Sequence, residues 1–230
     1  MAPLVFALRS LPWEVEPFRL CLALGPLAIY LLLLGVINLS RRPFLVTGPR
    51  DTAALGLAIA GLLVVGPIEL LLPQKALIVN GWVVWLLVGV MYALCLSLVV
   101  LLARPRITIY NVSAEVLQPV LAEVIGSLDP HARWAGNSVV LPGLSVELHV
   151  ERYPLARNVT LVANSDQQSL AGWRMLAEAL RRRLRTAEST RSAWGAGLLL
   201  AGLLMLGLLA WTIATDSQAV SQGFQEMIRL

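Results

Sequence analysis

The chain has 230 residues, of which 57% are hydrophobic and 14% are charged, whereas soluble proteins average roughly 45–50% and 25%. Its mean hydropathy is +0.74 and its formal net charge is +4. This composition excludes an ordinary soluble domain and indicates a multi-pass membrane protein. The basic residues adjoin apolar stretches, so membrane topology accounts for the charge and no nucleic-acid partner is expected.

The N-terminal segment, residues 1–17, is expected to lie along the outer membrane interface. It lacks the features of a signal peptide, because its first basic residue is Arg9 and no short apolar core precedes a small-residue cleavage site. Pro12 and Pro17 break the segment before the first long apolar stretch.

Four apolar stretches are long enough to cross a hydrocarbon core about 30 Å thick. They are expected at residues 18–39, 52–72, 81–103 and 193–215. Each is too long and too uniformly apolar for an ordinary core helix. The predicted fold is therefore a polytopic α-helical protein with four transmembrane helices, in which residues 104–192 form a small domain inserted between the third and fourth spans.

The distribution of basic residues predicts the orientation. The loop before the second span has three arginines, the loop before the third has only Lys75, and residues 104–191 have eleven. The first loop and the 104–192 domain are therefore expected to be cytoplasmic, with both termini outward. Because Lys75 is the single lysine among 18 basic residues, a GC-rich bacterial genome and the bacterial inner membrane are expected.

The segment 104–192 has the pattern of a cytoplasmic α+β domain. Two helices are expected to cover one face of a four- or five-stranded antiparallel sheet. Pro119 either starts the first helix or kinks it, and Ser165 or Asp166 is expected to cap the last one. The order is strand 107–110, helix 113–128, strands 132–135, 138–141, 145–152 and 158–163, and helix 167–191.

The last of these helices is basic and amphipathic, and it leads directly into the fourth span. Clusters of basic residues beside a span are typical of contact with anionic lipid headgroups. The plainer alternative is a solvated helix whose charges keep a small domain soluble. The residues expected to meet headgroups are Arg41, Arg42, Arg104, Arg106, Arg181, Arg182, Arg183 and Arg185.

Three polar residues alternate along the strand at 145–152. Glu147, His149 and Glu151 share one face and have the chemistry to bind a metal or move protons. Such a row is more often the solvated side of a sheet. Neither a metal nor a cofactor is expected, since the chain has no Cys/His cluster and no nucleotide-binding motif. Cys21 and Cys95 are expected to be free thiols at different depths.

Glu69 is the one acidic residue inside a predicted span. A carboxylate within the membrane suggests a proton relay or a partner for a cation, and Pro67 can kink the helix beside it. Glu69 also lies one turn from the outer end of the span, where it can reach headgroups or water without any further role.

The C-terminal tail, residues 216–230, places Val220, Phe224, Met227 and Ile228 on one helical face. The tail is expected to lie on the outer membrane surface or to dock into a groove of a partner protein.

Together these features favour a non-enzymatic accessory, scaffold or assembly subunit of a larger bacterial inner-membrane complex. Its expected partners are membrane lipids and other membrane protein subunits. One alternative is a small transporter or channel component that uses Glu69 and the kink at Pro67. A less favoured one is a membrane enzyme that uses Glu147, His149 and Glu151.

Overall fold

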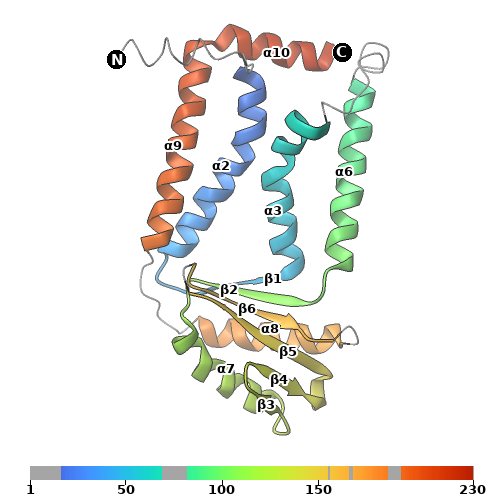
Figure 1. The fold of residues 1–230 in the computed structure, drawn as a ribbon, viewed down its shortest axis with the longest axis vertical. Helices are drawn as coiled ribbons and strands as arrows, with labels where there is room; N and C mark the ends of the chain where they lie inside the picture. Colours follow the sequence, from blue (N-terminus) through green and yellow to red (C-terminus); the bar gives the residue numbers. More distant parts are fainter. Residues whose placement is uncertain (1–16, 69–81, 155, 166–167, 186–192, 230) are drawn as a thin grey trace. The chain divides into compact units, whose positions relative to one another are not determined.

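The structure is a computed structural model that describes residues 17–68, 82–154, 156–165, 168–185 and 193–229 (Figure 1). The interfacial segment 1–16 and Glu69 lie outside the described residues. In chain order the elements are α2 (Pro17–Leu39), β1 (Phe44–Thr47), α3 (Gly48–Leu63), the π-helical turn η1 (Val64–Ile68), α6 (Trp82–Leu102), β2 (Arg106–Tyr110), α7 (Ala114–Leu128), β3 (Arg133–Ala135), β4 (Ser138–Leu141), the 3₁₀ turn η2 (Pro142–Leu144), β5 (Val146–Tyr153), β6 (Asn158–Ala163), α8 (Leu170–Leu184), α9 (Ala193–Thr215) and α10 (Ser217–Arg229).

Two compact units divide the chain, and each is described by itself. The first contains Met1–Ile29, Leu57–Tyr92 and Gly202–Leu230, and the second contains Tyr30–Gly56 and Ala93–Ala201. In the first unit, α2 and α3 approach closely at Gly61, where an added Cβ would collide with the backbone oxygen of Leu22.

Four helices are long and apolar enough to cross a membrane, as the sequence predicts. They are Pro17–Leu39, Gly48–Gly66, Val83–Leu102 and Ala193–Thr215. The chain is thus a multi-pass membrane protein. The second of these helices begins at Gly48 rather than near residue 52. Pro49 favours this earlier start, because proline is well accommodated in a first helical turn.

A six-stranded antiparallel sheet has the order β1-β2-β6-β5-β4-β3. The five strands expected between residues 104 and 192 are all present, each within one residue of its expected ends. The sixth strand, β1, comes from the segment between the first two spans and was expected to be a loop. It pairs with β2 through Leu45↔Ile109. We use the name α+β domain for β1 together with the chain from β2 to α8, which lies within the second compact unit.

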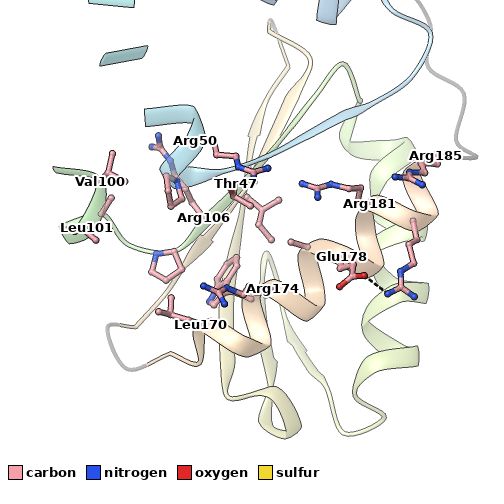
Figure 2. A pocket seen from close by; sticks show the side chains of 17 residues that line it. Thr47, Arg50, Val100, Leu101, Arg106, Leu170, Arg174, Glu178, Arg181 and Arg185 are labelled. Atoms are coloured by element: carbon pink, nitrogen blue, oxygen red, sulfur yellow. Dashed lines mark hydrogen bonds and ion pairs between the residues drawn. The ribbon is translucent and has the colours of Figure 1, made fainter. Parts of the chain in front are cut away.

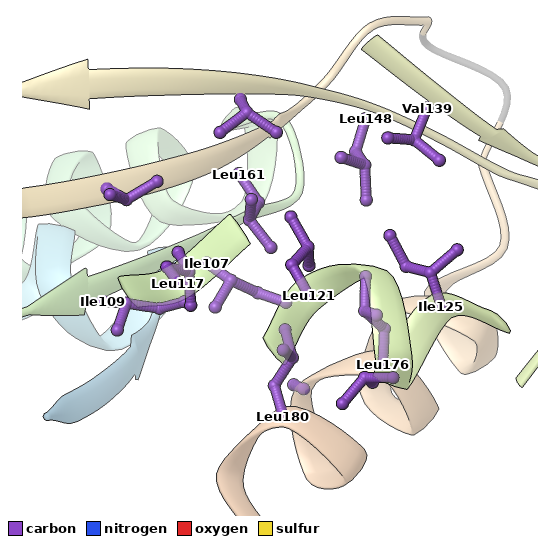
Figure 3. Packing of buried hydrophobic residues seen from close by; sticks show 14 of the residues in the cluster. Ile107, Ile109, Leu117, Leu121, Ile125, Val139, Leu148, Leu161, Leu176 and Leu180 are labelled. Atoms are coloured by element: carbon purple, nitrogen blue, oxygen red, sulfur yellow. The ribbon is translucent and has the colours of Figure 1, made fainter. Parts of the chain in front are cut away.

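The hydrophobic core lies between this sheet and the two helices α7 and α8 (Figure 3). Leu121 and Ile125 of α7 meet Leu176 and Leu180 of α8, and all four are at most 2% exposed. Leu161 of β6 is fully buried against them. Burying such side chains contributes about 1.5–3 kcal/mol each, so the core fixes both helices on one face of the sheet.

Helix α7 begins within one residue of its expected start, whereas α8 differs from expectation at its cap. Helix α7 begins at Ala114 with Pro119 inside it, so the alternative in which Pro119 starts the helix is wrong. Helix α8 is capped by Ser169, whose hydroxyl accepts a hydrogen bond from the Gly172 backbone amide at 3.1 Å. The expectation of a cap at Ser165 or Asp166 was therefore wrong, because a serine closer to the first buried turn satisfies the free amide.

Candidate functional site

A cavity of about 830 Å³ lies where α8, the first turn of α3, the start of β2 and the end of α6 meet (Figure 2). Six of its lining residues are arginines, whereas Glu178 is its one acidic residue. We call it the arginine cavity. The arginines are Arg50, Arg106, Arg174, Arg181, Arg182 and Arg185.

Helix α8 contributes its arginines by simple helical spacing. Arg174, Arg181 and Arg185 stand seven and four residues apart, which puts them on one side of the helix. The neighbouring side, including Trp173 and Leu180, is buried in the core. Core packing fixes the rotation of α8 about its own axis. The arginine side of the helix therefore faces the cavity.

The first turn of α3 is positioned by close packing on β2. An added Cβ at Gly48 would collide with the side chain of Arg106, so the backbone there approaches β2 as only a glycine permits. Thr47, Pro49 and Arg50 then line the cavity. The free amides and positive dipole end of α3 therefore belong to the same region as the arginines.

A polar network joins α3 to β2 at the edge of the cavity. The carboxylate of Asp51 accepts hydrogen bonds from the Tyr110 hydroxyl at 2.7 Å and from the Arg106 guanidinium at 3.3 Å. The same guanidinium donates to the Thr52 hydroxyl at 3.0 Å. Burial, followed by the bond to Asp51, raises the pKa of Tyr110, so its hydroxyl remains a donor at alkaline pH values where an ordinary tyrosine ionises. Arg106 therefore stabilises the fold as well as lining the cavity.

The charge of the cavity is only partly balanced. Glu178 pairs with Arg182 at 2.6 Å, and Asp51 pairs with Arg106. Among the residues that the structure describes, no acidic side chain forms an ion pair with the four others, which are Arg50, Arg174, Arg181 and Arg185. Guanidinium groups bind phosphate and carboxylate oxygens in pairs, so the cavity is suited to an anion.

The arginines expected to meet headgroups separate into two sets. The cavity brings together Arg106, Arg181, Arg182 and Arg185. Arg183 instead points toward α7, where it pairs with Glu123 at 2.8 Å. Three others are exposed and do not line the cavity; these are Arg41, Arg42 and Arg104.

Sequence reasoning missed two arginines of the cavity. Arg174 lies two turns before Arg181 on the same side of α8, a spacing that the sequence displays. Arg50 is expected in the loop before the second span, whereas it lies in the first turn of α3. Helical spacing is thus a usable signal for Arg174, and for Arg50 the sequence offers only Pro49 as a sign that the helix begins early.

Each residue of the row on β5 forms a hydrogen bond, and the side chain of His149 links β5 to another strand. The ring nitrogen Nδ1 of His149 lies 2.9 Å from the Ser138 hydroxyl on β4. Glu151 accepts from the hydroxyl of Tyr153 at 2.8 Å. The backbone carbonyl of Glu147 accepts from Gln168 at 2.6 Å. Among the described residues, no group of three or more His, Cys, Asp or Glu is placed to hold a metal ion.

The tail forms α10, as expected from its pattern. In the first compact unit, Phe224 of α10 stacks edge-to-face on Phe18 at the start of α2, with ring centroids 5.8 Å apart. Phe224 therefore contacts its own chain, although 50% of it stays exposed. Val220 is partly buried, and the side chains of Met227 and Ile228 lie outside the described residues.

Comparison with known protein families, with curated proteins and with solved structures finds no match for this chain. The fold and the cavity thus define its class: a multi-pass membrane protein with a small antiparallel sheet region and an arginine-lined cavity.

Proposed function

We propose that this chain is a non-enzymatic accessory, scaffold or assembly subunit of a larger bacterial inner-membrane complex. We further propose that its α+β domain contacts anionic lipid headgroups. In this proposal the domain is cytoplasmic and both termini face outward, because the arginines are concentrated on the domain side. The observation that carries it is the arginine cavity, in which four guanidinium groups have no acidic partner among the described residues.

A structural role also agrees with how the other polar side chains are used. His149 is bonded to Ser138, and Asp51 is bonded to Tyr110 and Arg106. These bonds connect one element to another: β5 to β4 in the first case, and α3 to β2 in the second. The side chains of His149 and Asp51 therefore link neighbouring elements of this fold.

The transmembrane helices have exposed apolar side chains that further subunits could contact. Along α6, Leu87 and Leu94 are 61% and 66% exposed, and a close approach to α3 occurs where Gly56 meets Leu96. In a membrane such a surface is covered by lipid tails or by helices of another subunit. Other membrane protein subunits are the partners that an assembly role requires.

The lipid part of this proposal is tested by hydrogen exchange on the full chain in lipid nanodiscs. We expect the backbone amides of α8 to exchange more slowly in nanodiscs containing anionic phosphatidylglycerol than in purely zwitterionic ones. The core strand β5 serves as the internal control, because its exchange reports global stability. Equal exchange of α8 in both lipids would contradict headgroup contact.

The subunit part is tested by photo-crosslinking in native membranes. A photoreactive residue at Leu94 is expected to capture one defined protein and to shift the 25.0 kDa chain into a larger complex. The same probe at buried Leu209, which is 6% exposed, is the matched control and should capture none. A monomer that crosslinks only to lipid would count against an assembly role.

One observation favours a second candidate function, that of a small transporter or channel component. The turn η1 is π-helical and contains Pro67, and such turns are frequent at functional sites. It directly precedes Glu69 in the sequence. This function requires a flux in proteoliposomes that Glu69→Gln abolishes, and an unchanged flux in that variant would remove it.

A further inference from the structure

A second cavity adjoins the arginine cavity and shares two residues with it. This second cavity measures about 450 Å³, and both cavities are lined by Arg50 and Arg181. Its other walls are mostly apolar side chains of α2 and β1, among them Leu33, Ile37 and Val46. We call it the apolar cavity. The two shared arginines therefore stand where a strongly basic cavity meets an apolar one.

This arrangement matches the chemistry of a membrane lipid more closely than that of a free anion. A soluble phosphate would use the guanidinium groups and the first amides of α3, but would leave the apolar walls unused. A phospholipid has a phosphate at one end and hydrocarbon at the other. Since both cavities belong to the second compact unit, one molecule can occupy both.

The charge of the site indicates how many phosphate groups it accommodates. Two acidic side chains face the cavities, Glu178 and Asp51, and each is already paired with an arginine. Four lining arginines have no acidic partner among the described residues. One phosphodiester carries a single negative charge, so a ligand with two phosphates balances this charge better than a ligand with one.

We propose that the two cavities form one binding site for a phospholipid that carries two phosphate groups, the cardiolipin class. Its phosphates lie between α3 and α8, against Arg50 and Arg181, and an acyl chain enters the apolar cavity. Basic pockets between membrane helices are a known form of site for such headgroups. This inference rests on the proposed function, because it requires the domain to lie at a membrane surface that contains anionic lipid.

Native mass spectrometry of the full, delipidated chain in detergent tests the proposal. The probes are tetraoleoyl cardiolipin and dioleoyl phosphatidylglycerol at equal phosphate concentration. We expect one cardiolipin per chain, bound at least about tenfold more tightly than phosphatidylglycerol. Arg50→Gln and Arg181→Gln should each weaken cardiolipin binding by about tenfold or more, because each removes a charge-assisted hydrogen bond. Both arginines are exposed, so the core is not disturbed.

Two further variants separate this site from general surface charge. Arg183→Gln removes the same charge from the same helix, but Arg183 pairs with Glu123 on α7, so cardiolipin binding should not change. Ala54→Phe keeps every charge and narrows the apolar cavity that Ala54 lines. It should weaken cardiolipin binding, and unchanged binding would overturn the place given to the acyl chain. Circular dichroism confirms that each variant is folded.

The outcomes also distinguish this inference from the proposed function. Equal binding of the two lipids, or equal losses in Arg181→Gln and Arg183→Gln, would overturn the two-phosphate site. The slower exchange of α8 in anionic nanodiscs would then still support headgroup contact. If α8 exchanges equally in anionic and zwitterionic nanodiscs, the lipid contact itself fails.

Discussion

Tyr110 and Tyr153 form the same kind of hydrogen bond in different surroundings. Each donates its hydroxyl to a carboxylate, Tyr110 to Asp51 at 2.7 Å and Tyr153 to Glu151 at 2.8 Å. The first bond is partly buried and joins α3 to β2, whereas the second is exposed and local. The burial of the groups decides how much each bond stabilises the fold.

Tyr110→Phe is therefore expected to lower the free energy of unfolding by about 1–3 kcal/mol, since it removes a hydrogen bond to a partly buried carboxylate. The matched control Tyr153→Phe should change it by less than about 0.5 kcal/mol. Urea unfolding in detergent, followed by tryptophan fluorescence, measures both. Equal effects of the two substitutions would show that the Asp51 network does not stabilise the domain.

The Tyr110 hydroxyl also makes the stability of the fold depend on pH. Burial and the bond to Asp51 raise the pKa of Tyr110, so near pH 10 the unfolded chain loses this proton while the folded chain keeps it. The unfolded state then binds fewer protons, and stability falls as pH rises above about 10.

Unfolding measured from pH 8 to 11 should thus show a steeper loss of stability in the wild-type chain than in Tyr110→Phe. Below pH 9 the stability difference between the two chains should be constant. Parallel curves throughout this range would mean that Tyr110 ionises equally in both states.

Among the elements, β1 is the one that changes the architecture most. It belongs to the short segment between two spans, yet it forms an edge of the sheet and buries Leu45 to 6% exposure in the core. Its neighbour Phe44 is 47% exposed. The segment between the first two spans is therefore part of the α+β domain by packing and strand pairing.

Leu45→Ala is expected to destabilise the α+β domain by about 2–5 kcal/mol, because it leaves a cavity in a close-packed core. Phe44→Ala, in the same strand, should cost clearly less because its side chain is already half exposed. Limited proteolysis in detergent provides the readout, with faster cleavage within the domain for Leu45→Ala. Equal cleavage of both variants would mean that β1 does not contribute to the core.

The elements also show what the sequence can and cannot reveal. The spans and the alternating strand β5 were predictable, since both depend on local periodicity. The strand β1 was not, because four residues between two spans have no period of their own and pair with residues of β2 that are 60 to 66 positions away. The N-cap Ser169 was missed for a related reason: nearby polar residues offered equally good local caps, and tertiary packing selected among them.

The candidate site also contains some residues that the sequence could assign and others whose position depends on tertiary packing. Arg181 and Arg185 were expected to meet headgroups because they stand beside a span, and the structure places both in the arginine cavity. Arg183 lies between them in sequence but faces Glu123. Its direction depends on how α8 packs against α7, which charge patterns do not encode.

For the whole molecule, the proposed orientation rests on one asymmetry of charge. The α+β domain and the first loop carry most of the arginines, whereas the tail after α9 has Arg229 alone. Short segments rich in arginine are retained on the cytoplasmic side. The domain and α10 should therefore lie on opposite sides of the membrane.

Single-cysteine labelling in whole cells tests this orientation. In a background in which Cys21 and Cys95 are both replaced by Ala, His131→Cys places a thiol in the domain, where the native side chain is 89% exposed. Gln222→Cys places one in α10, at an exposed position. A membrane-impermeant maleimide should label Gln222→Cys in intact cells, and His131→Cys only after permeabilisation. The reverse pattern would invert the orientation and put the arginine cavity on the outer face. Labelling of both thiols in intact cells would mean that the domain and α10 share one side.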